Sequence, residues 1–291
     1  MNEALRALAV LLEPPRPEHA AIAAALELPA VPSPDEHTAV LVFQAYPYAS
    51  VYLGAEGMLG GEARDRIAGF WRALGGEPPV EPDHLSVLLA GVAALDGAPG
   101  SVRAALFWEH VASWMPPYLA TLRRVGAPFH VAWAELAATL LAELAAELGP
   151  SVRLPLALRA APAISAAPGG LDELLATLLA PVRTGFVVVR DDLERAAADL
   201  GLGLRAGERR FALRALLAED PAAVLDWFAA EAQRRVAELA MFAPSDRDPA
   251  SPIALFWAAR ARASAAWLAE LASLARQRRA PGPSATDAAL R

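Results

Sequence analysis

The chain of 291 residues contains no cysteine. Disulfide bonds, iron–sulfur ligation by thiolates and cysteine nucleophiles are therefore excluded. Lysine is absent as well, because every one of the 26 lysine-or-arginine positions is an arginine. This second absence excludes the lysine of a phosphate-binding P-loop and the Schiff-base chemistry of lysine enzymes.

Other signatures of catalysis are also missing. The chain has no nucleophile elbow of the Gly-x-Ser-x-Gly type, and its five histidines show no metal-ligand spacing such as a pair four residues apart. The glycine-rich stretch from Gly54 to Gly61 follows no clear parallel strand, so we interpret it as a loop that lets helices approach closely. We expect no catalytic site, no metal and no cofactor.

Long apolar runs are absent too, although the chain is apolar overall. Hydrophobic residues make up 55% of it and its mean hydropathy is +0.30, largely because of alanine, the best helix former. No uncharged apolar run of about eighteen residues and no signal-peptide pattern occur, so we expect a soluble, cytoplasmic protein without membrane insertion. The formal charge of −7 disfavours a broad nucleic-acid surface and suits a cationic partner.

Apolar periodicity predicts helices along most of the chain, and the expected fold class is all-α. We divide the chain into a helical domain over residues 1–150, a linker or strap over 151–170, a C-terminal helical module over 171–279 and a disordered tail over 280–291. The division rests on a helix that ends at Gly149-Pro150 and on the proline, alanine and glycine that follow it.

Capping patterns place several helix starts. Ser33 and Glu36 form a capping-box pattern around a proline, whereas Ser101, Asp220 and Ser251 are expected as single caps. The segment after the capping box, Val40 to Phe43, favours strand by its residue types and helix by its cap, and we expect helix. Residues 186–189 are the one convincing strand candidate, without a partner strand to pair with.

The stretch from Tyr46 to Leu95 organises these elements. An aromatic segment comes first, a helix with an apolar face follows over about 61–74, and a second helix starts near Leu85. Its apolar positions recur at helical spacing up to Leu95. Asp83 is placed to cap this second helix, with His84 at its first position and nearly exposed.

These residues carry a family resemblance. The aromatic segment and the acidic segment some thirty residues later resemble the paired motifs of the TorD/DmsD/NarJ family of redox-enzyme maturation chaperones. In the family the aromatic motif reads Tyr-x-x-Leu-Phe-x-Gly, and many members have a residue between the proline and the aspartate that this chain lacks. The residues that match are Tyr48, Val51, Tyr52 and Gly54 in the first segment and Glu81, Pro82, Asp83 and His84 in the second.

The resemblance implies an all-α chaperone fold and a function. Members of the family bind the twin-arginine signal peptide of a molybdenum oxidoreductase subunit in the cytoplasm and hold the apoprotein until its cofactor is inserted. The eight matching residues are then the expected peptide-binding site. Guanidinium groups prefer carboxylates, and an apolar run could lie against Tyr48, Tyr52, Trp71 or Trp114. Asp83 is either a plain helix cap or a carboxylate that a peptide arginine reaches.

A second interpretation concerns residues 190–214. A helix, a glycine turn at Gly201 and a helix bearing Arg205, Arg209, Arg210 and Arg214 have the order of a DNA-binding helix-turn-helix. The acidic residues within this segment and the negative charge of the chain argue against DNA. We therefore keep a DNA-binding regulator as the alternative and expect no nucleic acid.

Overall fold

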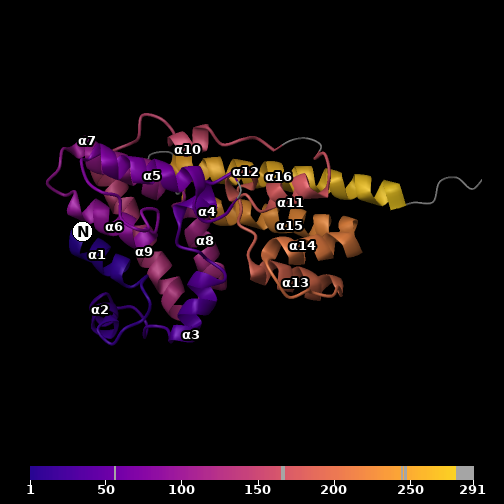
Figure 1. Ribbon diagram of the computed structural model, residues 1–291, viewed down its shortest axis with the longest axis horizontal. Coiled ribbons are helices and arrows are strands. Elements are labelled where there is room, and N and C mark those ends of the chain that lie inside the picture. Colours follow the sequence, from indigo (N-terminus) through magenta and orange to yellow (C-terminus); the bar gives the residue numbers. More distant parts are fainter. Residues whose placement is uncertain (56, 165–167, 244, 246–247, 280–291) are drawn as a thin grey trace, which may run out of the picture.

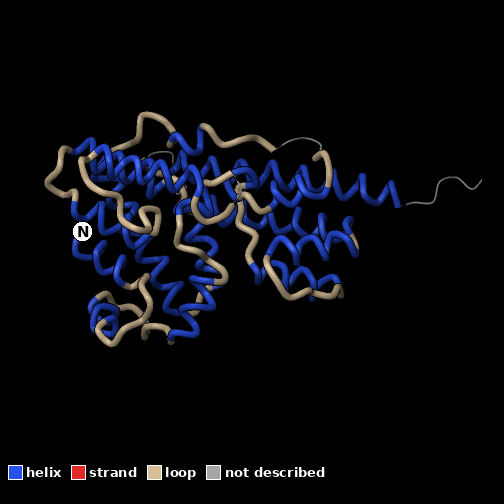
Figure 2. Tube along the Cα trace, viewed as in Figure 1, coloured by secondary structure: helices blue, strands red, loops and turns tan. Residues whose placement is uncertain are grey.

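The computed structural model describes residues 1–55, 57–164, 168–243, 245 and 248–279. Every element in these ranges is a helix, as Figure 2 shows, so the predicted all-α fold class is confirmed. The predicted strand at 186–189 is wrong, because these residues run as extended, buried backbone without a neighbouring strand. The predicted disordered tail, 280–291, lies outside the described residues.

The first half of the chain forms one group of short helices around a long one (Figure 1). Its elements are α1 (Asn2–Val10), α2 (His19–Ala25), α3 (Pro34–His37), the π-helical η1 (Thr38–Val42), α4 (Ala49–Leu53), α5 (Gly61–Ala73), α6 (Leu85–Ala94), α7 (Gly100–Ala105), the π-helical η2 (Leu106–Ala112), α8 (Met115–Val125) and α9 (Pro128–Leu148).

The second half begins with a short helix on the strap and ends with its two longest helices, which pack against each other. Its elements are α10 (Leu156–Arg159), α11 (Leu171–Leu178), α12 (Pro181–Thr184), α13 (Arg190–Leu200), α14 (Arg209–Glu219), α15 (Pro221–Ala240) and α16 (Ser251–Arg279). None of the helices in the described part of the chain is long and apolar enough to cross a membrane.

Local sequence signals located some of the helix starts. The capping box of Ser33 and Glu36 is present with both hydrogen bonds, and the carboxylate of Asp220 accepts a hydrogen bond from the Ala223 N–H at the start of α15. Two predicted caps are wrong. Pro99 precedes α7, so Ser101 lies inside that helix; the Ser251 hydroxyl donates to the Ser245 carbonyl instead of accepting from its own helix.

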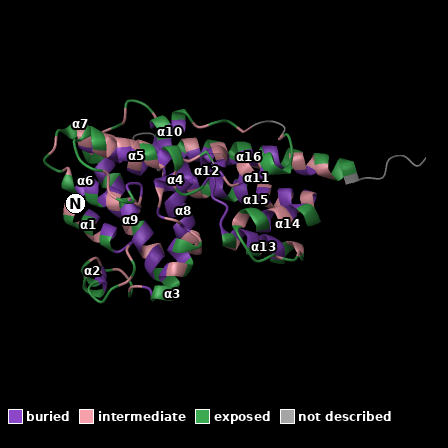
Figure 3. Ribbon diagram, viewed as in Figure 1, coloured by how far each residue is buried: buried purple, intermediate pink, exposed green. Residues whose placement is uncertain are grey.

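Two hydrophobic clusters hold the molecule together, and Figure 3 shows the buried residues running through its interior. The first cluster joins α1, α4, α6, α8 and α9 and includes Trp114 and Trp133. It also takes Trp257 from α16. The second cluster joins α11, α13, α14, α15 and the later part of α16. The packing therefore does not separate at residue 150, and the proposed domain boundaries stay a prediction.

The extended segment 186–189 connects the two clusters. Phe186 and Val188 pack in the second cluster, and Val187 and Val189 pack in the first. Successive side chains of an extended backbone point to opposite sides, so one segment contributes to both cores. This requirement explains why a run with the composition of a strand lacks a partner strand: both of its faces are covered by helices.

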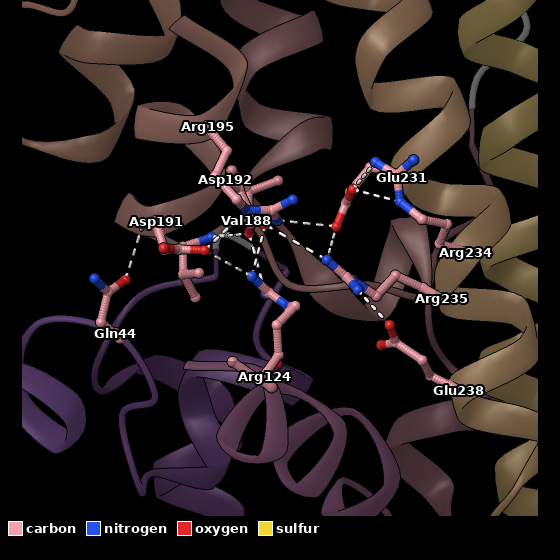
Figure 4. A network of polar contacts seen from close by, with 12 residues as sticks. Gln44, Arg124, Val188, Asp191, Asp192, Arg195, Glu231, Arg234, Arg235 and Glu238 are labelled. Carbon is pink, nitrogen blue, oxygen red and sulfur yellow. Dashed lines mark hydrogen bonds and ion pairs between the residues drawn. The ribbon is translucent and has the colours of Figure 1, made fainter. Parts of the chain in front are cut away.

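A buried ion-pair network joins the two halves beside this segment (Figure 4). The carboxylate of Asp192 on α13 is 2% exposed and accepts hydrogen bonds from both terminal nitrogens of Arg124 on α8, at 2.7 and 3.2 Å. Arg195 donates to the same carboxylate at 2.6 Å, and so does the backbone N–H of Val189 at 2.8 Å. Arg195 also reaches the buried Glu231 of α15 at 3.1 Å.

We predict that Asp192→Ala lowers the free energy of unfolding by roughly 3–5 kcal/mol, because it removes the buried carboxylate that the partly buried Arg124 and Arg195 share. Its neighbour Asp191 is the matched control. Asp191 is 38% exposed and pairs with two of the same arginines, so Asp191→Ala should cost no more than about 1 kcal/mol. Urea unfolding followed by circular dichroism measures both; equal losses would contradict the central role of Asp192.

Buried histidines lie in the first half of the molecule. His130 is 2% exposed, and neither of its ring nitrogens has a hydrogen-bond partner among the described residues. Burial, with a smaller contribution from His37, lowers the pKa of His130 to about 4, and Glu36 opposes the shift. The pKa of His37 is lowered by burial as well. These side chains are therefore neutral in the folded protein at pH 7.

This neutrality predicts an acid-sensitive fold. The unfolded chain binds a proton at His130 below the ordinary pKa of 6.5, whereas the folded chain binds it only near pH 4. Stability is therefore lost as the pH falls from 6.5 to 4, on the order of 1 kcal/mol per pH unit. In His130→Leu the unfolding free energy should fall less steeply over this window; an unchanged slope in urea titrations at several pH values would contradict the assignment.

Candidate functional site

The two motif segments lie against each other as a short piece of paired backbone. The N–H of Ala49 donates to the carbonyl of Asp83 at 3.0 Å, and the N–H of Leu85 donates to the carbonyl of Pro47 at 2.8 Å. Tyr48 and His84 thereby form an isolated antiparallel bridge. Segments more than thirty residues apart in sequence thus meet at the starts of α4 and α6.

Asp83 caps a helix, but not the predicted one. Its carboxylate is 2% exposed and accepts from the backbone N–H of Ser50, at 3.2 Å, in the first turn of α4. The N-cap of α6 is His84, whose Nδ1 accepts from the N–H of Ser86 at 3.2 Å. The predictions of Asp83 as the α6 cap and of His84 as the first helical residue are therefore wrong. Arg64 on α5 lies 4.0 Å from the other oxygen of Asp83.

Tyr48 and Glu81 form the accessible part of the paired segments. Glu81 is exposed, and its carboxylate lies near the Tyr48 hydroxyl. Burial, with Glu81 next in importance, raises the pKa of Tyr48 to about 12. The ring of His84 stands edge-on to that of Tyr48, with 4.7 Å between centroids. Pro82, between the two carboxylates, is buried.

A third carboxylate, that of Glu13, reaches this place from the segment after α1. The hydroxyl of Ser86 donates to Glu13 at 2.8 Å and lies 2.6 Å from Nδ1 of His84. Serine therefore stands between the histidine and the glutamate. In the catalytic triad of serine hydrolases the histidine lies between the serine and the acidic residue. The contact of His84, Ser86 and Glu13 is therefore not a catalytic triad. Burial lowers the pKa of His84, and the nearby carboxylates Glu13 and Glu81 oppose the shift.

Val51 and Tyr52 lie in the core. Tyr52 is fully buried, stacks on Trp114 at 5.0 Å between centroids and meets Tyr118 edge-on. Val51 is 2% exposed. A ligand on the present surface does not touch these side chains or Trp114. Their predicted peptide contacts stay a prediction and require the packing around α4 to open.

The glycine-rich loop after α4 packs closely against the second half of the chain. A Cβ on Gly57 would stand 1.8 Å from the carbonyl oxygen of Leu179, and one on Gly54 would stand 2.5 Å from that of Ser50. Gly57 also has a positive φ of 63°. The loop thus serves close approach, as expected, and the matching Gly54 is explained by packing at the end of α4.

Two adjoining cavities begin where α4 ends. They lie between α5 and the strap that carries α10, have volumes of about 340 and 480 Å³, and share Leu53, Ala63, Arg66 and Ala157 in their linings. Exposed Met58 and Leu59 border the first, and Phe70 borders the second. The carboxylate of Glu109 fixes the strap by accepting from the N–H of Leu156 at 2.6 Å. The resulting groove is lined by apolar side chains and also by charged ones, namely Glu62, Arg66, Glu109 and Arg159.

The arginines of the predicted helix-turn-helix mostly contact the protein itself. Arg209 donates to the carbonyl of Val188 at 2.8 Å, while Arg210 and Arg214 both pair with Asp172. Residues 201–208 separate α13 from α14, a connection longer than the three or four residues of that motif. Two helices follow each other as predicted, but the connection between them is not the short turn of a helix-turn-helix.

Glu13 and Ser86 were not anticipated by sequence reasoning. Glu13 follows α1 and carries no motif, and Ser86 is one of many serines inside predicted helices. Only the packing of α1 against α6 brings them to His84. In the part of the chain that the structure describes, no group of three or more histidine, cysteine, aspartate or glutamate residues could hold a metal ion.

The cap made by Asp83 predicts different outcomes for two substitutions. Asp83→Asn keeps an oxygen that accepts from Ser50 and should change the free energy of unfolding by less than about 0.5 kcal/mol, whereas Asp83→Ala removes it and should cost about 1 kcal/mol or more. Urea unfolding compares them. An asparagine variant as unstable as the alanine variant would show that the negative charge, facing Arg64, stabilises the fold instead of the hydrogen bond.

Comparison with known proteins identifies no relative. No family model matches the chain, and the comparisons with curated proteins and with solved structures likewise found no match. The family resemblance therefore rests on the residues of the two paired segments.

Proposed function

We propose that this protein is a maturation chaperone that binds the twin-arginine signal peptide of a molybdenum oxidoreductase subunit in the cytoplasm and assists its assembly. The observation that supports the proposal most is the pairing of the two motif segments, in which Tyr48 and His84 form a backbone bridge. Two segments that resemble one family's peptide-binding motifs thus lie side by side, with Tyr48, Glu81 and His84 reaching the surface.

The charges at this surface fit an arginine-bearing ligand. Glu81 is exposed and Glu13 lies within the same contact network, whereas Asp83 is buried and already accepts a hydrogen bond. Carboxylates bind guanidinium groups through paired hydrogen bonds. We therefore assign arginine recognition to Glu81 and Glu13, with Tyr48 beside them, and a positioning role to Asp83.

The apolar run of the peptide is assigned to the groove between α5 and the strap. Tyr48 precedes α4, and the groove begins at Leu53 at the other end of this helix. Five helical residues span roughly 7–8 Å, a distance that an extended peptide covers in two or three residues. A ligand with arginines followed closely by apolar residues has matching dimensions.

The alternative, a DNA-binding regulator, has less support. Arg209, Arg210 and Arg214 are hydrogen-bonded within the protein, so α14 has few arginines free for phosphates. The overall charge of −7 also opposes the approach of a polyanion.

A labelled peptide with two consecutive arginines and an apolar run tests the proposal by fluorescence anisotropy. An exposed ion pair contributes up to about 1 kcal/mol, so Glu81→Gln should weaken binding by up to about fivefold. The double variant Glu13→Gln/Glu81→Gln should weaken it by about tenfold or more. A peptide with lysines in place of the arginines should bind less well, because lysine lacks the bidentate fork.

Glu77→Gln is the matched control, since Glu77 is exposed in the same connection between α5 and α6 and has no hydrogen-bond or ion-pair partner in the described structure. It should bind like the wild type. If the double variant also binds like the wild type, arginine recognition does not occur at this surface.

A further inference from the structure

A separate pocket lies between η1 and the start of α14, and it is positively charged, whereas the surface around Glu81 is acidic. Its volume is about 290 Å³, and its lining includes Phe43, Tyr46, Arg190, Arg205 and Arg209. It shares no lining residue with the groove beside α5, and Tyr46 is the one residue it takes from the aromatic segment. The pocket therefore needs an interpretation of its own.

The three arginines leave the pocket with positive charge. Arg209 donates to two backbone carbonyls, those of Val188 and Gly57, which do not neutralise it. Arg205 is exposed and has no hydrogen-bond or ion-pair partner in the described part of the chain. Arg190 pairs with Glu194, an exposed pair that solvent screens. Glu208 is the one acidic residue in the lining.

Apolar and aromatic groups stand next to these charges. Phe43 is 56% exposed and its neighbour Val42 is 47% exposed, so an apolar rim borders the pocket. The guanidinium of Arg209 lies over the ring of Tyr46, 5.5 Å from its centroid, which is within the limit of about 6 Å for a cation–π contact. Leu204 adds an apolar wall beside Arg205.

We propose that this pocket binds an acidic peptide segment of a partner protein, with carboxylates on Arg190 and Arg205 and an apolar side chain against Phe43. Charge complementarity supports this occupant, because three arginines and a single glutamate line the pocket. The proposal does not depend on the signal-peptide function, which concerns a cationic ligand and other residues.

The arrangement favours a peptide over a phosphate compound or DNA. The arginines come from three places, the start of α13, the connection after it and the start of α14. Carboxylates spaced along a chain can reach such separate groups, whereas phosphate sites gather several donors on one group. The apolar rim at Phe43 has no use in binding a phosphate backbone.

Two short fluorescent peptides test the proposal in anisotropy titrations at low salt: one of glutamate and leucine, and one of glutamate and serine. The wild type should bind the first more tightly, and added salt should weaken both. Arg205→Glu should weaken both by about tenfold, through lost attraction and added repulsion. Phe43→Ala should weaken only the leucine-containing peptide.

Arg262→Glu is the matched control, because Arg262 is exposed on α16 and has no hydrogen-bond or ion-pair partner in the described structure; it should bind like the wild type. The proposal is overturned if neither peptide binds, if Arg262→Glu weakens binding as much as Arg205→Glu, or if inorganic triphosphate or duplex DNA binds more tightly than the peptides. Arg205→Glu should still bind the twin-arginine peptide, so each proposal can fail without the other.

Discussion

The buried carboxylate of Asp192 is the interaction on which the arrangement of the two halves depends. It accepts hydrogen bonds from Arg124 of α8, from Arg195 of its own helix and from the backbone before that helix. Burying a carboxylate is unfavourable unless hydrogen bonds and opposite charges compensate it. Arg124 comes from the first half, so the compensation is complete only when α8 and α13 are docked as the structure has them.

The same docking determines where the candidate sites lie. Val189, whose N–H donates to Asp192, ends the extended segment that contributes side chains to both hydrophobic clusters. The preceding carbonyl, that of Val188, accepts from Arg209 and so places this arginine over Tyr46. Arg209 also reaches the carbonyl of Gly57 in the glycine-rich loop. The basic pocket and the loop after α4 are thus positioned by the contacts that join the halves.

Sequence reasoning located what local chemistry decides. The capping box at Ser33 and the cap at Asp220 involve partners three residues away, and both are present. Asp83 shows the limit of the method: its helix-capping chemistry was recognised, but the helix it caps is α4, whose first turn lies 33 residues earlier in the chain. Tyr52 shows a second limit, since an aromatic motif does not tell whether the ring faces a ligand or Trp114. The strand prediction at 186–189 is wrong because β-branched and aromatic residues indicate a segment buried on both faces. They do not indicate whether strands or helices pack against those faces.

Charges of opposite sign border one short segment of the chain. Tyr46 lines the basic pocket beneath Arg209, and Tyr48, two residues later, lies near Glu81 at the acidic surface. Pro47 between them is buried and accepts from the Leu85 N–H, which fixes the backbone at this point. A partner with basic and acidic stretches would therefore meet both surfaces in one orientation, because exchanging its two stretches would bring like charges together. Two weak, charge-based contacts on a rigid segment can in this way select the direction of a bound chain, which neither contact could select alone.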